Sequence, residues 1–295
     1  MKKFNIRQKT KGIILAGGKG TRLYPSTKAI SKQMLPIYNK PMVYYPLSTL
    51  MLMNIKEILI ISTPQDVESY KRLLNDGSNL GLNIQYSIQE NPRGIPEAFL
   101  IGENFINNSN CVLILGDNIF YGHDLENLLN KNLTINGCTI FTYNVSNPED
   151  FGVLVKRKKK IEIIEKPKKF VSDKAITGLY FFDKNVTKFS KTLKVSKRKE
   201  LEITDLLKIY QKKNKLKSFS LKRGYAWLDT GTINGYLSAS NFIHAIETRQ
   251  GQMVACIEEI ALRKKFINLG KFKKLIDNTN SEYNLYLKKI YQNAL

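Results

Sequence analysis

The residues with the clearest chemical potential lie near the start of the chain, where an apolar run that ends at Leu15 leads into Gly17, Gly18 and Gly20. Without a Cβ, glycine lets backbone amides approach a phosphate closely. Spacing excludes two familiar loops: a dinucleotide-binding loop that starts at Gly18 needs glycine where Leu23 stands, and a P-loop needs Ser or Thr where Gly20 stands. The segment therefore predicts another kind of phosphate-binding turn, with a tight strand exit as the alternative.

Two cationic side chains follow these glycines. Arg22 comes directly after Thr21, and Lys32 lies ten residues further on, within the pattern G-G-x-G-T-R-L-x-P-x-T-x-x-x-S-K-x-x-L-P. Cations beside a triphosphate make charge-assisted contacts that neutralise the phosphates and stabilise a charged transition state. The pattern therefore predicts that Arg22 and Lys32 act on a triphosphate held by the glycine segment.

Two aspartates follow apolar runs that are typical of buried strands. Asp117 comes after the run at 112–115, and Asp229 comes after Trp227 and Leu228. Ligand sites in open α/β sheets favour the carboxyl ends of strands. Two carboxylates, with phosphate oxygens and waters, can complete the octahedral shell of Mg²⁺. We therefore expect Asp117 and Asp229 to hold Mg²⁺, with a turn or helix cap as the alternative for either residue alone.

Further motifs follow in a fixed order along the chain. They are PMVYYPLS from Pro41, ISTP from Ile61, GDNIFYG from Gly116, EKP from Glu165, TGLY from Thr177, ELEITD from Glu200 and RGYAWLDTGT from Arg223. Together with the glycine segment, these motifs resemble the sugar nucleotidyltransferases, and among them most closely the glucose-1-phosphate thymidylyltransferases. The resemblance extends from about residue 12 to residue 266.

The resemblance implies a reaction of dTTP with α-D-glucose 1-phosphate that gives dTDP-α-D-glucose and diphosphate, the first step towards dTDP-rhamnose and other deoxysugars. The sugar phosphate is already an anion at neutral pH, so its in-line attack on the α-phosphorus needs no general base. Catalysis then depends on positioning and charge neutralisation. Arg22 would stabilise the departing diphosphate and Lys32 the α-phosphate, while Mg²⁺ as cofactor would bridge the reacting groups.

The resemblance also implies two sets of binding residues. The nucleotide would be held by Leu15, Gly17, Gly18, Gly20, Thr21, Gln89 and Gly94, of which Gln89 and Gly94 would recognise the thymine edge. The sugar phosphate would be held by Gly152, Glu165, Lys166, Ile176, Tyr180 and Arg198, with Lys166 and Arg198 on the phosphate. Simpler interpretations stay open: a surface lysine at 166, strand core at 180 and a polar strand end at 89.

The chain departs from the family pattern at three positions. Glu97 stands where the family usually has Gln before Ala-Phe, and an ionised carboxylate cannot donate a hydrogen bond to a base. Ile164 replaces the first glutamate of Glu-Glu-Lys-Pro, and Lys199 replaces a glycine next to Arg198. None of the three changes removes a predicted metal ligand or catalytic cation, so we expect an active enzyme.

The elements that position these residues follow from the hydrophobic pattern. Short apolar runs predict strands at 12–16, 57–62, 84–89, 111–115 and 139–145. Periodic segments predict intervening helices near 41–54, 66–75, 96–106 and 125–133. This alternation indicates βαβ units and a largely parallel sheet. Less regularly connected strands are expected at 151–155, 161–164, 176–182 and 217–221, and the pattern is helical from about 233 onward.

We therefore expect an α/β protein with the three-layer α/β/α, Rossmann-like nucleotide-diphospho-sugar transferase fold that the resemblance implies, built on a mixed, largely parallel central sheet. No repeat or linker marks a clean domain boundary. The expected organisation is an N-terminal extension at 1–11, a nucleotidyltransferase core at 12–232 and a helical C-terminal region at 233–295 that packs on the core.

Composition narrows the class of protein. The chain has 295 residues, 42% of them hydrophobic, which argues against wholesale disorder. No secretory signal is visible, and no apolar run reaches the ~20 residues of a membrane helix, so we expect a cytoplasmic protein without a membrane partner. The cysteines Cys111, Cys138 and Cys256 show no C-x-x-C spacing, and the first two lie in apolar runs that favour buried thiols over a disulfide or zinc site.

The charge balance is strongly basic, with 47 Lys and Arg against 25 Asp and Glu, a formal net charge of +22. Such a value invites a nucleic-acid interpretation. The lysines are spread over most of the chain, however, and no basic-aromatic module accompanies them. We therefore expect solvated surface lysines, a field that also tolerates anionic substrates, and no nucleic-acid partner.

Two other functions stay open at this stage. One is a nucleotidyltransferase that uses UTP, because one thymine methyl is worth only about 1–3 kcal/mol in a pocket. The other is a binding protein that keeps the fold without the reaction, against which the retention of both cations and both aspartates argues. The resemblance further implies a homo-oligomer, as a tetramer, with an end-product dTDP-sugar as allosteric inhibitor at a second site.

Overall fold

The computed structural model describes residues 10–18, 20–133, 136–157 and 160–295. The expected N-terminal extension lies outside the described residues except for Thr10 and Lys11, and these two already belong to the first strand, β1 (Thr10–Leu15). β1 is buried from Gly12 onward and pairs in parallel with β4 (Glu57–Ser62) on one side and with β6 (Asn110–Leu115) on the other. The strand that leads into the glycine segment is therefore held from both sides.

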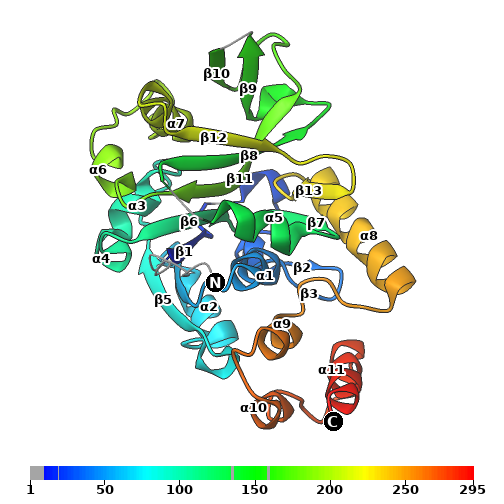
Figure 1. Cartoon of the computed structure of the whole chain (residues 1–295). Helices are drawn as coiled ribbons and strands as arrows, with labels where there is room; N and C mark the ends of the chain where they lie inside the picture. The colour runs from blue at the N-terminus through cyan, green and yellow to red at the C-terminus, as the bar shows by residue number, and fades with distance from the viewer. Residues whose placement is uncertain (1–9, 19, 134–135, 158–159) are drawn as a thin grey trace, which may run out of the picture.

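A nine-stranded mixed sheet runs through the described chain in the order β10-β9-β11-β6-β1-β4-β5, with β8 beside β11 and β12 beside β8 (Figure 1). β5 continues the parallel set from β4, whereas β11 runs antiparallel to β6, β8 and β9. The parallel strands of the first half and the mixed character of the sheet are thus confirmed. The bounds of the other strands are β5 (Asn83–Ile88), β8 (Cys138–Asn144), β9 (Gly152–Arg157), β10 (Lys160–Glu165), β11 (Lys174–Phe182) and β12 (Leu216–Ser220).

Alternate side chains of the central strands enter two separate cores, one on each face of the sheet. Ile14 and Ile60 pack with helices α1 (Tyr44–Leu52), α2 (Val67–Leu74) and α5 (Leu125–Asn132). Ile13 and Ile61 belong to the opposite core. Its helices are α3 (Glu97–Ile101), α4 (Glu103–Ile106), α6 (Val186–Ser190) and α7 (Ile203–Lys212). Helices on both faces of one sheet confirm the three-layer α/β/α architecture.

Two small sheets lie beside the main one. β2 (Pro36–Ile37) pairs with β3 (Lys40–Pro41), and β7 (Asn118–Gly122) pairs antiparallel with β13 (Tyr225–Asp229). The hydrophobic pattern did not predict the β7–β13 pair, because its partners are more than 100 residues apart along the chain. This pair sets Asp229 opposite Asn118 and so brings the two predicted metal ligands to one place.

The C-terminal part of the chain is helical, as expected. It comprises α8 (Ile233–Gln250), α9 (Ile257–Arg263), α10 (Leu269–Lys273) and α11 (Glu282–Asn293), and Figure 1 shows α9 to α11 gathered at the end of the molecule opposite the β9–β10 hairpin. Short 3₁₀ turns complete the described structure: η1 (Thr21–Leu23), η2 (Lys32–Met34), η3 (Ser78–Leu80) and η4 (Pro148–Asp150). Among the described helices, none is long and apolar enough to span a bilayer.

Two buried features concern individual residues: the cysteines, for which the sequence made a prediction, and an ion pair, for which it made none. All three cysteines are free and buried, as predicted for Cys111 and Cys138. The ammonium of Lys40 forms a buried ion pair with Glu247 on α8 (2.7 Å), and Asn39 also donates to that carboxylate (2.8 Å). This contact holds α8 against the β2–β3 hairpin. Separating the two would leave an uncompensated buried charge, which is strongly unfavourable.

Candidate active site

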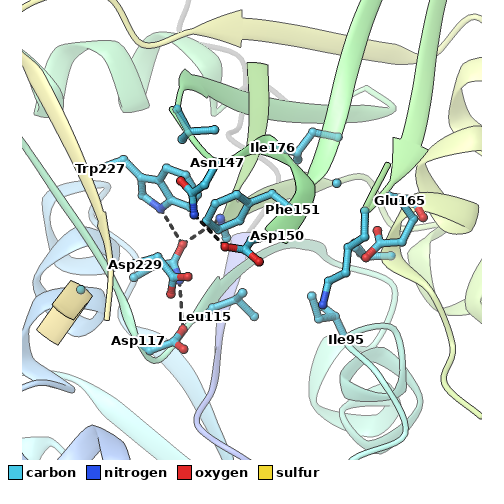
Figure 2. Close-up of a pocket in the computed structure, with 18 of the residues that line it drawn as sticks. Ile95, Leu115, Asp117, Asn147, Asp150, Phe151, Glu165, Ile176, Trp227 and Asp229 are labelled. Atoms are coloured by element: carbon cyan, nitrogen blue, oxygen red, sulfur yellow. Dashed lines mark hydrogen bonds between the residues drawn. The ribbon is translucent and has the colours of Figure 1, made fainter. Parts of the chain in front are cut away.

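A cavity of about 830 Å³ lies at the carboxyl end of β6 (Figure 2). Ten of the sequence-predicted site residues line it: Arg22, Gly94, Asp117, Gly152, Glu165, Lys166, Ile176, Tyr180, Arg198 and Asp229. Within the described part of the chain, seven others do not: Leu15, Gly17, Gly18, Gly20, Thr21, Lys32 and Gln89. Figure 2 shows the acidic pair on one side of the cavity and Glu165 on the other. Residues predicted from distant motifs therefore share one site.

The two aspartates lie at the ends of different strands, and Thr230 connects their backbones. Asp117 follows β6, and Asp229 ends β13. The backbone N–H and the hydroxyl of Thr230 both donate to the carbonyl oxygen of Asp117, at 3.1 and 2.9 Å. The carboxylate of Asp229 accepts the N–H of Gly231 (3.2 Å). These contacts therefore hold the backbones of the two aspartates close together.

The two carboxyl groups have opposite pKa shifts. Burial and the negative charge of Asp117 raise the pKa of Asp229 from 3.8 to about 6. Burial acts the same way on Asp117, but the ammonium of Lys32 and hydrogen bonds from Lys32 and Asn118 outweigh it and hold the pKa below its usual value. The site therefore confines two like charges beside each other, an arrangement that a bound cation relieves.

Both predicted cations lie at this acidic pair. Lys32, from η2, forms an ion pair with Oδ2 of Asp117, and both side chains are mostly buried. Arg22 is exposed on η1; a Cβ at Gly231 would lie 2.8 Å from its Nη2 and 3.2 Å from Oδ1 of Asp229. Absence of a side chain at 231 thus leaves room for the guanidinium beside Asp229. Lys32 joins the site through Asp117, although it does not line the cavity.

Asn118 is a residue whose role the sequence analysis missed. Its Oδ1 accepts the indole N–H of Trp227 (2.7 Å) and the backbone N–H of Gly178 (2.9 Å). Its Nδ2 donates to Oδ1 of Asp117 (3.0 Å). A single buried carboxamide therefore connects the metal-ligand candidate Asp117 with β11 and β13. The signal was its place directly after Asp117 inside the GDNIFYG motif.

The glycine segment leaves β1 in a conformation that favours glycine. Gly18 and Gly20 have φ of 109° and 58°, in the left-handed region where a side chain is strained. Gly20 caps η1, and its carbonyl oxygen accepts the hydroxyl of Thr27 (2.8 Å). The carbonyl of Leu15 accepts the N–H of Gly116, which joins this turn to the segment that carries Asp117 (2.9 Å).

The predicted base-recognition residues lie together between β5 and α3. Gln89 is 4% exposed and lies against Gly17, because a Cβ at 17 would be 2.6 Å from its Oε1. Gly94 has a φ of 101°, and a Cβ there would lie 2.1 Å from the carbonyl oxygen of Leu201. The loop therefore requires glycine at 94 and packs tightly on the segment that precedes α7.

The sugar side of the cavity carries a charged cluster around Arg198. Its guanidinium is 2.5 Å from Glu202, 3.2 Å from Glu165 and 3.6 Å from Glu200. Burial raises the pKa of Glu165, with Arg198 opposing and Glu202 adding to that rise. The structure thus brings Arg198 and Glu165, both predicted on the sugar-phosphate side, into contact, but it also gives Arg198 three carboxylate partners with which a phosphate would compete.

The remaining sugar-side residues surround this cluster. Lys166 is exposed at the cavity edge with a φ of 39°, an uncommon conformation for a side chain other than glycine. A Cβ at Gly152 would lie 3.2 Å from Oε2 of Glu165, so glycine keeps the approach to that carboxylate open. Tyr180 and Ile176 line the cavity but are 3% and 6% exposed, which makes them part of the core as well.

The donor set suits a hard cation better than a transition metal. Among the described residues, no group of three or more His, Cys, Asp or Glu side chains is placed to hold a metal. Two carboxylates on a cavity that admits phosphate oxygens match the demands of Mg²⁺, which retains waters and takes few protein ligands. The raised pKa of Asp229 beside an ionised Asp117 agrees with a place where positive charge is needed.

Sequence comparison identifies the class of protein. A nucleotidyl transferase family model matches residues 11–246, and the chain belongs to that family. A UDP-glucose pyrophosphorylase solved with UDP-glucose superposes with a TM-score of 0.70 at 25% identity, covering 80% of this chain and 99% of that one. Both the family match and the superposition therefore assign the chain the nucleotidyl transferase fold described above.

More similar relatives narrow the identification. Glucose-1-phosphate thymidylyltransferase of Neisseria meningitidis is 47% identical over 284 residues, which cover 95% of this chain and 99% of the relative. The enzyme of the same name from Xanthomonas campestris pv. campestris is 49% identical over 268 residues, covering 90% and 91%. A Bacillus anthracis protein assigned to the same group, solved with a sucrose, gives a TM-score of 0.73 at 37% identity over 79% and 94%. Within its family, the chain belongs to the glucose-1-phosphate thymidylyltransferases.

Proposed function

We propose that the protein transfers a thymidylyl group from dTTP to α-D-glucose 1-phosphate. A phosphate oxygen of the sugar phosphate forms a bond to the α-phosphorus, the bond between the α-phosphorus and the bridging oxygen breaks, and diphosphate leaves. The observation that carries this proposal is the cavity in which Arg22, the acidic pair and Glu165 meet. Its two ends suit a nucleotide and a sugar phosphate, respectively.

The chain's own residues act by positioning and by charge. Gly18 and Gly20, with backbone in the left-handed region, would let amides approach the phosphates, and Arg22, next to Asp229, would supply positive charge to a departing diphosphate. Lys32 holds Asp117 in place through their ion pair, and its ammonium would act on the α-phosphate. No general base is required, because the attacking phosphate is ionised at neutral pH.

Mg²⁺ would be held by Asp117 and Asp229. When bound there, it supplies charge neutralisation and a fixed orientation for the phosphate oxygens. Asn118 keeps Asp117 in its orientation, and the Gly231 N–H does the same for Asp229. Support for this part of the proposal comes from the chemistry of the donor set and from the raised pKa of Asp229.

We also infer a homotetramer in the cytoplasm that an end-product dTDP-sugar inhibits at a second site. The resemblance to the family supports this inference. The apolar side chains that α8 leaves at the surface, Ile233 at 59% and Leu237 at 56% exposed, support association between copies of the chain. Light scattering of the purified protein tests the mass. Inhibition that is not overcome by raising both substrates tests the second site.

The assay for the main proposal is diphosphate release with glucose 1-phosphate and Mg²⁺, run in parallel with dTTP and UTP. Release with dTTP that disappears in Asp117→Ala supports the reaction and the role of the acidic pair. Equal rates with UTP would keep nucleotidyl transfer and discard the thymidylyl assignment, the alternative that likeness to a UDP-glucose pyrophosphorylase favours. No release with any nucleotide would favour a binding protein.

A further inference from the structure

The side chain of Gln89 is fixed in one orientation by a neighbour. Its backbone N–H continues the pairing of β5 with β4 by donating to Ser62 (2.8 Å). Its Nε2 donates to Oε2 of Glu97 (2.7 Å). With only 4% of the residue exposed, the carboxamide has little freedom to exchange this partner for water. The orientation of Gln89 therefore depends on what stands at position 97.

Glu97 is itself held in place. Its Oε2 also accepts the backbone N–H of Arg93 (3.2 Å), its own N–H bonds the carbonyl of Gly94 (3.3 Å), and its side chain is 17% exposed. The guanidinium of Arg93 lies 4.0 Å away but is 67% exposed, so it contributes little. The carboxylate thus forms part of the loop structure rather than a mobile surface group.

A carboxylate in its ionised form only accepts hydrogen bonds. Gln89 must therefore turn its NH₂ group towards Glu97 and its carbonyl oxygen the other way. The structure places that oxygen beside Gly17, where a Cβ would lie 2.6 Å from it. Gln89 consequently presents an acceptor, and not a donor, next to the glycine segment. A glutamine at 97 would impose this choice less strictly, because its carboxamide can present either its oxygen or its NH₂ group to Gln89, although the N–H of Arg93 favours the oxygen.

We propose that Glu97 is a positioning residue that makes Gln89 a hydrogen-bond acceptor for the nucleotide base. The acceptor suits a pyrimidine with an imino N–H, as in thymine or uracil. Cytosine has an unprotonated ring nitrogen at that place, which sets acceptor against acceptor. Glu97 then selects against cytosine nucleotides and leaves the choice between thymine and uracil unchanged. This inference rests on the proposed function only for the place of the base beside Gln89.

Equilibrium binding separates this inference from the reaction itself. Calorimetric titration with dTTP, UTP and dCTP, in Mg²⁺ and without a sugar phosphate, compares wild type with Glu97→Gln. The substitution keeps size and shape and lets Gln89 rotate. We expect dTTP to bind at least tenfold more tightly than dCTP to wild type, and this ratio to fall about tenfold in the variant. The dTTP to UTP ratio stays unchanged, because both bases carry the imino N–H.

Glu90→Gln is the matched control. It removes the same charge from an exposed residue next to Gln89 in the chain, so the dTTP to dCTP ratio stays at the wild-type value. An unchanged ratio in Glu97→Gln, or an equal fall in the control, overturns the positioning role. Equal weakening of all three nucleotides does the same, since it indicates loop damage. Selective binding without any turnover would refute the proposed reaction and leave the inference intact.

Discussion

Replacing Asp229 with asparagine is expected to stabilise the metal-free protein while it abolishes turnover. The pKa of Asp229 is raised from 3.8 to about 6, so the folded state binds this proton more tightly than the unfolded chain does. The free energy of unfolding therefore falls as pH rises from about 4 to 6. A shift of about two units corresponds to about 3 kcal/mol at pH 8, which the neutral asparagine recovers in part.

The assay is thermal unfolding in EDTA at pH 8 and at pH 4. At about 2 °C per kcal/mol for a chain of this size, we expect the midpoint of Asp229→Asn to lie about 4 to 6 °C above wild type at pH 8. The difference should disappear near pH 4, where the aspartate is protonated as well. Glu149→Gln, which neutralises an exposed carboxylate, is the control and should leave both midpoints unchanged.

Two results would refute this reasoning. A variant that is less stable than wild type at pH 8 would mean that the ionised Asp229 is stabilised by its surroundings, against the direction of its pKa shift. A gain of equal size at both pH values would mean that the substitution acts through packing and not through charge.

The remaining predictions concern the metal and the backbone around the site. Mg²⁺ is expected to raise the unfolding midpoint of wild type but not of Asp229→Asn, because only a folded protein with both carboxylates binds the ion. Equal shifts of the two midpoints would disprove this. Trp227→Phe removes the N–H donated to Asn118 (2.7 Å) and should cost about 1–2 kcal/mol in urea unfolding, and no loss would contradict it. Gly94→Ala should destabilise strongly because its Cβ meets a carbonyl oxygen at 2.1 Å, whereas Gly251→Ala, with φ of 62° and open space, should cost only about 1 kcal/mol. Equal losses of stability in the two alanine variants would mean that backbone strain, and not the clash with the carbonyl oxygen, causes the destabilisation of Gly94→Ala.

The sequence predicted the parts of the fold that local patterns determine. Strands near 12, 57 and 111 could be predicted because buried parallel strands are continuous apolar runs. The helices between them could be predicted from the periodic spacing of their apolar residues. The β7–β13 pair could not be predicted, because its pairing joins residues more than 100 positions apart in the chain. The helix expected at 96–106 is divided at Gly102 into α3 and α4.

The candidate site was predictable as a set of residues but not as a set of contacts. The motifs pointed to Asp117 and Asp229. They gave no sign that Lys32 pairs with Asp117 or that Asn118 connects Asp117 with β11 and β13. At Glu97, the sequence showed only that an ionised carboxylate cannot donate a hydrogen bond to a base. The contact with Gln89 offers a different role for that carboxylate, as an acceptor that orients its neighbour.

Phosphorus NMR of the complete reaction shows whether the protein transfers a thymidylyl group to the sugar phosphate. Protein, Mg²⁺, dTTP and glucose 1-phosphate are mixed, and the phosphorus signals are followed with time. We expect the dTTP and sugar phosphate signals to decline together while a nucleoside diphosphate sugar and inorganic diphosphate appear in equal amounts. Orthophosphate as the product, or a sugar phosphate signal that does not change while dTTP is consumed, would contradict it.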